Sequence, residues 1–414
     1  MKKLKIPNLI FSLVLISLIA SYILGEDSLG GAKHDYLFHQ KFIELFAKDF
    51  NNTIQFYGAE NYNARNSPVL YIFLSFLIKL GFPLEFIKYL NSIAIIFLFH
   101  SFCICLRTKY PKVNFEVYIF FLISITLSPT IRSLLIWPYP LIWALIFFIY
   151  SIYFYLKFLE SKFIKNKFKY ALKNIFFVAL SAYLTPNFSI FALYFFYYFL
   201  KVFRFEKEIF YLIFLNLILA IPAFIYYHLT DYYILNNNYP FTNLNLNFSN
   251  KIIIISSLIF FYFLPFLKIK DLNINNKKFN INYKNCVLIF FILANILLFD
   301  FVENAGGGIF FHLSNLLFNN SVILFLIFNI FIYLINKLNY LNFNNIYFFF
   351  IIILFNIQYT IYHKYFDPLL LFLFLFLFDF KQNKNLNLSK ISKNNFFLYS
   401  FFLLISFGKT YINY

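Results

Sequence analysis

The sequence predicts an all-helical protein that crosses a membrane many times. Of its 414 residues, 62% are hydrophobic and only 13% are charged, and the mean hydropathy is +0.72. A helix that spans a bilayer needs roughly 20 mostly apolar residues, and such runs follow one another here with short polar interruptions. Basic residues concentrate in alternate interruptions, as in multi-pass membrane proteins. We therefore expect one integral membrane domain over residues 1–414, a bundle of about 12–14 spans.

The first expected span covers residues 7–24, after the basic start Met1-Lys2-Lys3. No small-x-small cleavage site follows it, so we expect this helix to be retained rather than removed as a signal peptide. Residues 25–67 form the first outer loop. The other expected spans lie at roughly 68–82, 84–106, 113–131, 139–158, 174–185, 187–203, 208–229, 251–268, 285–300, 321–338, 344–360, 366–380 and 394–408.

The distribution of charge predicts the orientation. With the N-terminus in the cytoplasm, most of the 35 basic residues fall in inner loops and most of the 17 acidic ones in outer loops. The formal charge of +18 therefore reflects topology, and it does not indicate a nucleic-acid partner. The three cysteines contain no C-x-x-C pair, which disfavours structural zinc and a disulfide framework. We expect a multi-pass protein of an inner or plasma membrane whose working face is periplasmic or extracellular.

The first outer loop contains the best candidate for chemistry. A helix over residues 34–50 would place Asp35 and His39 on one face, since they are four residues apart. Its apolar stripe would make the helix amphipathic and hold it on the membrane surface. The stripe consists of Phe38, Phe42, Leu45, Phe46 and Phe50. The loop ends at Ser67-Pro68, which is typical of a helix N-cap followed by the first helical residue.

Asp35 is the candidate general base of this loop. A carboxylate at a membrane surface is ionised at neutral pH and can accept the proton of an attacking hydroxyl, help that is typically worth about 10²- to 10⁴-fold in rate. His34 and His39 flank it. The same residues also fit a solvated aspartate beside two interfacial histidines, and the sequence leaves both interpretations open.

Three further stretches carry candidate binding residues. Arg132, in Ser128-Pro129-x-x-Arg132, matches a phosphate or carboxylate, although it also fits an interfacial anchor beside Trp137. His363 and Lys364 can hold a phosphate, while Asp367 caps the helix that Pro368 begins.

The stretch from Glu303 to His312 contains three consecutive glycines, Gly306 to Gly308. Glycine lets the backbone approach a ligand closely or adopt positive φ, and a flexible outer loop explains the same residues equally well. The stretch is not a Walker loop or a dinucleotide fingerprint, because the strand and helix contexts are missing.

Four motifs together resemble the GT-C superfamily of glycosyltransferases that use polyprenyl-phosphate sugars, in particular its bacterial members. The motifs are His34-Asp35-x-x-x-His39, Asn66-Ser67-Pro68-x-x-Tyr71, Ser128-Pro129-x-x-Arg132 and His363-Lys364-Tyr365-Phe366-Asp367-Pro368. The resemblance implies a GT-C-like fold and an inverting hexosyltransferase. Such an enzyme transfers a monosaccharide from a polyprenyl-phosphate donor to a cell-envelope glycan, lipid or protein on the outer side of the membrane.

The resemblance also assigns roles to single residues. Asp35 matches the catalytic base. Arg132, Lys364, Arg65 and His363 would bind the donor phosphate, and His34, His39 and Glu303 would orient the acceptor. No cofactor and no metal ligand is expected. Tyr36 stands where many relatives carry a second acidic residue, which leaves a divalent metal open.

Two other classes of protein share the same composition. A flippase or transporter of lipid-linked glycans would place ionisable residues at mid-membrane and break its helices in two matching halves. An O-antigen-type polymerase or ligase would place its main outer loop late in the chain. Here ionisable residues avoid the centres of the expected spans and the longest outer loop comes first, so the sequence favours the glycosyltransferase.

Overall fold

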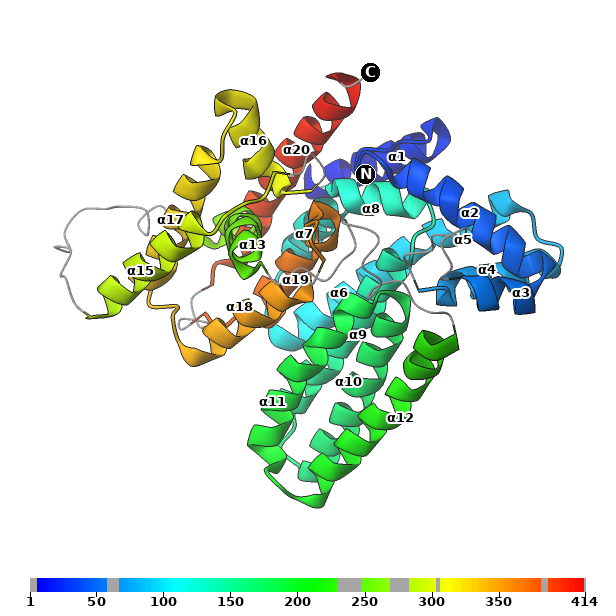
Figure 1. The fold of residues 1–414 in the computed structure, drawn as a ribbon, viewed down its shortest axis with the longest axis horizontal. Helices are drawn as coiled ribbons and strands as arrows, with labels where there is room; N and C mark the ends of the chain where they lie inside the picture. Colours follow the sequence, from blue (N-terminus) through cyan, green and yellow to red (C-terminus); the bar gives the residue numbers. More distant parts are fainter. Residues whose placement is uncertain are drawn as a thin grey trace, which may run out of the picture. The chain divides into compact units, whose positions relative to one another are not determined.

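The computed structural model describes residues 6–57, 67–229, 247–268, 283–302, 306–356, 358–380 and 386–412. Within these ranges every regular element is a helix, which confirms the all-helical prediction. The chain falls into two compact units: unit 1 comprises Met1–Asn236 and Asn387–Tyr414, and unit 2 comprises Asn237–Leu386 (Figure 1). Each unit is described by itself.

Unit 1 is built around two groups of packed helices. The long hairpin of α9 and α10 packs against α6 and α12, and α7 packs against α1 and α20 (Figure 1). The helix α2 packs against α4 and α8. The elements are α1 (Ile6–Leu24), α2 (Ala32–Lys48), α3 (Phe50–Phe56), α4 (Val69–Lys79), α5 (Leu84–Ser92), α6 (Ala94–Lys109), α7 (Phe115–Leu127), α8 (Pro129–Ile136), α9 (Pro140–Glu160), α10 (Ile164–Leu184), η1 (Pro186–Ile190), α11 (Phe191–Phe203), α12 (Lys207–Leu229) and α20 (Leu388–Ile412).

Unit 2 is organised around α13, which contacts α15, α16, α17, α18 and α19. Nearly every side chain from Ser249 to Phe263 is buried, because α13 is apolar on all sides and its neighbours surround it. The elements are α13 (Phe248–Phe263), η3 (Leu264–Phe266), α15 (Tyr283–Leu297), α16 (Gly308–Phe318), α17 (Val322–Lys337), α18 (Phe343–Phe355), η4 (His363–Tyr365) and α19 (Leu369–Phe376).

Aromatic side chains fill the core between α9 and α11. Phe148 lies 4.4 Å from Phe191, and Phe158 lies 4.9 Å from Phe199, measured between ring centroids. Helices inside a bilayer gain no hydrophobic driving force from meeting each other, so close packing of this kind holds them together. Each aromatic pair contributes about 0.5–1.5 kcal/mol beyond its buried area.

Five helices in the described residues are long and apolar enough to cross a membrane. They are Ile6–Leu24, Leu84–Lys109, Pro140–Glu160, Lys207–Ile225 and Phe248–Phe266. The helices α7 and α8 would count as a sixth span, and they bend by 66° between Leu127 and Pro129. These helices are those of a membrane protein, in agreement with the sequence.

The described residues contain fewer long apolar helices than the 12–14 spans that the sequence predicts. Several expected spans are shorter helices, such as α4, α17 and α18, with 11, 16 and 13 residues. At 1.5 Å per residue even 16 residues reach only about 24 Å, less than the roughly 30 Å of a hydrocarbon core. The expected span 366–380 contains an eight-residue helix, α19, that is buried along its whole length inside unit 2. Apolar runs in the sequence do not distinguish such core helices from spans.

Candidate functional site

The start of α2 is fixed by Asp27. Its carboxylate accepts hydrogen bonds from the backbone N–H groups of Gly31 at 2.9 Å, Ala32 at 3.0 Å and Lys33 at 3.1 Å. These are the donors that the first turn of a helix leaves unsatisfied. Asp35 follows in the first turn of α2 and is half-buried. The loop after α1 thus sets the position of the candidate base.

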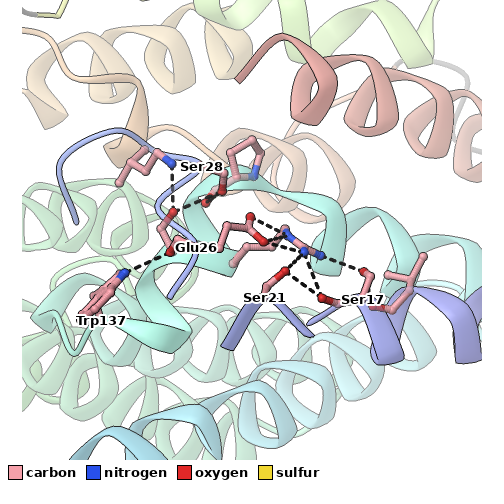
Figure 2. A network of polar contacts seen from close by, with 10 residues as sticks. Ser17, Ser21, Glu26, Ser28 and Trp137 are labelled. Atoms are coloured by element: carbon pink, nitrogen blue, oxygen red, sulfur yellow. Dashed lines mark hydrogen bonds and ion pairs between the residues drawn. The ribbon is translucent and has the colours of Figure 1, made fainter. Parts of the chain in front are cut away.

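The same loop contains a buried ion pair between Glu26 and Arg132 (Figure 2). Arg132 lies one turn into α8, whose N-cap is Ser128 with Pro129 at the first helical position. Its Nε donates to Glu26 Oε1 at 2.9 Å and its Nη2 to Oε2 at 2.7 Å. Only 3% of the Arg132 side chain and 7% of the Glu26 side chain are exposed. This two-pronged contact is the strongest geometry available to an arginine.

Helix α1 completes the shell of acceptors around the guanidinium. Nη1 of Arg132 donates to Ser17 Oγ at 3.1 Å, and Nη2 donates to the Ser17 carbonyl at 3.3 Å and to Ser21 Oγ. For Glu26, burial penalises the charged carboxylate, but hydrogen bonds from Arg132 and Ser21 and the charge of Arg132 outweigh that penalty and lower its pKa. Both partners are therefore charged at neutral pH.

Three further bonds fasten the loop along α8 (Figure 2). Ser28 Oγ donates to the carbonyl of Pro129 at 3.2 Å, and the N–H of Leu29 donates to Ser133 Oγ at 2.9 Å. The indole Nε1 of Trp137 donates to the carbonyl of Glu26 at 3.0 Å. The segment before α2 is thereby held against α8 from its first turn to its C-terminal end.

Two of the sequence motifs, and the stretch that follows a third, meet at His39. Its ring centroid lies 5.0 Å from that of Tyr71 and 5.1 Å from that of Tyr139. His39 is 3% exposed, and Tyr71 is 1% exposed. The His39 motif on α2, the Tyr71 motif on α4 and the stretch that joins α8 to α9 therefore come together inside unit 1.

A second group of rings and cations lies beside this cluster. Tyr36 packs on Trp137 with 5.7 Å between ring centroids. The ammonium of Lys88 lies 4.9 Å from the Trp137 ring and 5.2 Å from the Tyr36 ring, and that of Lys33 lies 5.9 Å from Trp137. Burial raises the pKa of Tyr36 to about 12. The sequence analysis did not single out Lys33, Lys88 or Glu26. Glu26 could have been recognised from its position, since it is the first acidic residue after the first apolar run.

The structure corrects two local predictions in unit 1. Phe42 and Phe46 of the predicted stripe are buried together with Tyr36, His39 and Ile43, whereas Phe38 and Phe50 are 38% and 40% exposed. Phe50 falls on a new helix, α3, because Asp49 ends α2 and accepts the N–H of Asn52 at 3.0 Å.

Neither Ser67 nor Asp367 is the residue directly before the helix that it was predicted to start. Helix α4 begins at Val69, whose N–H lies 3.4 Å from Ser67 Oγ, and that hydroxyl donates to the carbonyl of Tyr183. Helix α19 begins at Leu369, after Pro368, and Asp367 is buried with 2% exposure. In both cases the proline directly precedes the helix, whereas the prediction had placed it at the first helical position.

In unit 2, His363 and Lys364 lie on the short helix η4. His363 Nε2 is 2.7 Å from the hydroxyl of Tyr262. Burial, together with the nearby His312, lowers the pKa of His363 to about 3. The neutral ring can form a hydrogen bond but brings no positive charge to a phosphate. The ammonium of Lys364 lies 5.4 Å from the ring of Tyr362.

The glycine-rich stretch packs against the segment that leads to His363. Gly306 has φ +85°, and the N–H of Gly307 donates to the carbonyl of Ile361 at 3.0 Å. A Cβ on Gly306 would lie 2.8 Å from Thr360 Cγ2 and 2.9 Å from the Ile361 oxygen. Glycine is needed here for close contact with another part of the chain, so no ligand is required to explain it.

The predicted site residues are thus distributed over both units. His34 is exposed beside Asp35 on α2, and Arg132 is engaged by Glu26 in unit 1. His363 and Lys364 belong to unit 2. Arg65 and Glu303 lie outside the described residues. Within the described ranges, no three His, Cys, Asp or Glu side chains are grouped so that they could hold a metal ion.

Comparison of the chain with protein-family models, curated proteins and solved structures finds no match. The functional argument therefore rests on the residues and their contacts.

Proposed function

We propose that the chain is an integral membrane glycosyltransferase of GT-C type that uses a polyprenyl-phosphate sugar. The observation that carries this proposal is that two of the resembling motifs meet at His39, whose ring contacts Tyr71 of the second motif and also Tyr139, seven residues after Arg132. Motifs that resemble one active site should fold together, and these stretches are far apart in the sequence. Asp35 lies one turn before His39 on the same helix.

In the proposed reaction, the acceptor hydroxyl attacks the anomeric carbon of the donor sugar. Asp35 accepts the hydroxyl proton while the bond from the sugar to the lipid phosphate breaks with inversion. Asp35 lies in the first turn of α2 and is half-buried. His34, exposed beside it on the same helix, would orient the acceptor.

Cations must offset the charge that grows on the leaving phosphate. Lys33 and Lys88, whose ammonium groups lie near Trp137, are suited to this role in unit 1. The roles that the resemblance gives to Arg65 and Lys364 stay predictions. Arg132 would have to exchange the carboxylate of Glu26 for the phosphate, since Glu26 engages two of its three nitrogens. We place this chemistry on the outer side of the membrane, with the N-terminus in the cytoplasm, as the loop charges indicate.

The test compares the unaltered chain with Asp35→Asn in membranes supplied with polyprenyl-phosphate sugars. We expect consumption of the donor by the unaltered chain and a loss of about 10²-fold or more in the variant. Glu44→Gln is the matched control, because Glu44 is an exposed carboxylate on the same helix and accepts a hydrogen bond from Gln40 at 2.9 Å. Gel filtration in detergent verifies that both variants fold. Equal activity of Asp35→Asn and the unaltered chain would refute the assignment of Asp35.

One observation favours a second function, transport of a lipid-linked glycan. Transporters break their helices at the substrate site and place charged groups there, and α7 and α8 bend by 66° one turn before the buried pair of Arg132 and Glu26. The assay is movement of a labelled lipid-linked sugar between the leaflets of vesicles that contain the protein. Movement without consumption of the donor would favour transport over transfer.

A further inference from the structure

The turn between α9 and α10 and the turn between α11 and α12 lie at the same end of a helical bundle in unit 1 (Figure 1). The ring of Phe203, at the end of α11, lies 5.8 Å from that of Phe158 on α9 and 6.3 Å from that of Phe168 on α10. Phe168 also lies 6.2 Å from Tyr211 on α12. We call the residues 157–173 and 201–208 at this end the basic tip.

The basic tip is strongly positive. Its two segments contain nine basic residues and three acidic ones, and one acid, Glu160, is paired with Lys157 at 2.9 Å. Seven of the basic side chains are exposed: Lys162, Lys165, Lys169, Lys173, Lys201, Arg204 and Lys207. Such a density of one sign attracts an anionic partner.

Two large aromatic side chains stand at the apex of this charged surface. Phe163 is 72% exposed in the first turn, and Phe205 is 83% exposed in the second. Basic residues around exposed aromatic ones are typical of segments that lie in the headgroup layer of a membrane.

A second tier of cations lies closer to the bundle. Lys173 is 5.2 Å from the ring of Phe154, Lys167 is 5.5 Å from Phe158, and Lys201 is 4.1 Å from Tyr197. These side chains lay their apolar stems along aromatic surface and hold the charge at its edge. Lysines adopt this arrangement where a helix passes from hydrocarbon to headgroups.

We propose that the basic tip binds anionic lipid headgroups. The ammonium and guanidinium groups contact the lipid phosphates, and Phe163 and Phe205 insert at the level of the headgroups. Lipid fits better than a nucleic acid or an acidic protein because two candidate spans, Pro140–Glu160 and Lys207–Ile225, end at this tip. Membrane-crossing helices bring their own ends to the bilayer surface, within the roughly 8–10 Å over which surface charge acts.

The position of the lysines on α10 supports this partner. Lys165 and Lys169 are four residues apart and share one face of the helix, and Lys162 lies just before its start. Each basic residue near an anionic surface contributes roughly five-fold in affinity. The proposal does not depend on the glycosyltransferase, because no candidate site residue lies in the basic tip.

The experiment places a reporter at the apex with Phe163→Trp. The protein is reconstituted into vesicles of phosphatidylcholine and phosphatidylglycerol. Two samples are compared: in one the phosphatidylglycerol carries the bromine quencher, in the other the phosphatidylcholine does, and the mole fraction of brominated lipid is the same in both. The signal of Trp137 and Trp143, measured in the chain without the reporter, is subtracted. We expect the brominated phosphatidylglycerol to quench the added indole more strongly than the brominated phosphatidylcholine.

Two triple variants then identify the residues responsible. Lys162→Gln, Lys165→Gln and Lys169→Gln together should lower the preference for phosphatidylglycerol at least about five-fold, and added salt should do the same in the unaltered tip. The control, Lys41→Gln, Lys48→Gln and Lys79→Gln, removes the same charge from exposed positions elsewhere in unit 1 and should leave the preference unchanged.

Three outcomes would overturn the proposal. Equal quenching by the two lipids would show that the tip has no preference for anionic headgroups. Absence of quenching by either would place the apex away from the membrane, where a soluble acidic partner becomes the better candidate. An equal effect of the control triple would attribute the preference to net charge rather than to the tip.

Discussion

Removal of either partner of the Glu26 and Arg132 pair should destabilise the protein far more than removal of both. A buried charge that loses its counter-ion typically costs about 3–5 kcal/mol, whereas replacement of a whole buried pair by apolar groups is often neutral. The single variants Glu26→Gln and Arg132→Met and their combination form a double-mutant cycle that measures this coupling.

The structure predicts that the two single variants are unequal. In Arg132→Met, Glu26 can become protonated, and from an ordinary pKa of 4.5 this costs about 3.4 kcal/mol at pH 7. In Glu26→Gln, Arg132 cannot lose its proton, and it remains in a site that is 3% exposed, where Ser17 and Ser21 are its other acceptors among the described residues. We expect the glutamate variant to cost about 5 kcal/mol and the coupling to exceed about 2 kcal/mol.

The assay is unfolding in mixed micelles by titration with a denaturing detergent, followed by tryptophan fluorescence. Trp137 is a suitable probe because its indole donates to the carbonyl of Glu26. The control is the same cycle on Lys157 and Glu160, whose side chains are 32% and 48% exposed and whose coupling should stay below about 1 kcal/mol. A coupling for the buried pair within about 0.5 kcal/mol of zero would refute the reasoning.

Three further predictions follow from the same contacts. The pKa of Glu26 is lower in the folded chain than its ordinary value of 4.5, so the pair stabilises the fold above pH 4.5 and stops doing so as the pH falls through the folded pKa. The melting temperature should therefore fall more steeply in acid for the unaltered chain than for Glu26→Gln. Equal slopes for the two proteins would contradict this. Gly306→Ala should lower the stability by at least about 1–2 kcal/mol because of the positive φ of Gly306. Gly81→Ala is the control, since Gly81 has a similar φ but open space around an added Cβ. Equal losses of stability in thermal melts would mean that contact with Thr360 and Ile361 adds nothing. Tyr36→Phe should leave stability unchanged or higher, because the buried hydroxyl has no hydrogen-bond partner among the described residues, and a clearly lower melting temperature would show that this hydroxyl is bonded.

The long helices were predictable because a span is a local property of the sequence. The apolar runs at 7–24, 84–106 and 139–158 agree with α1, with α5 and α6 together, and with α9 to within a few residues. Several other expected spans are helices of 10–17 residues, and their number stays a prediction, because composition reports that a segment avoids water but not whether lipid or protein surrounds it. The break at Ser128 was missed for the same reason, since the apolar character continues through it.

The contacts of the candidate site depend on distant pairs, which a single sequence does not define. Arg132 was recognised as a cation that needs a partner, but its partner, Glu26, lies 106 residues earlier. His39 was expected beside an acceptor, and the structure shows it between two tyrosine rings. The roles of His39 in orienting the acceptor and of Asp35 as the base stay predictions.

The contact between α1 and Arg132 also sets an order for biogenesis. Helix α1 is 6% buried inside the protein, so it adds little to the core, yet Ser17 and Ser21 hold the guanidinium and Glu26 follows directly. The ribosome delivers these groups to the membrane before Arg132. Placing an arginine in a bilayer without a partner costs about 2.5–3.5 kcal/mol or more, so we expect the acceptors on α1 to ease the insertion of α8. A chain whose first helix is exchanged for an unrelated anchor would still be targeted to the membrane, but it would have lost the acceptors that let the broken helix enter.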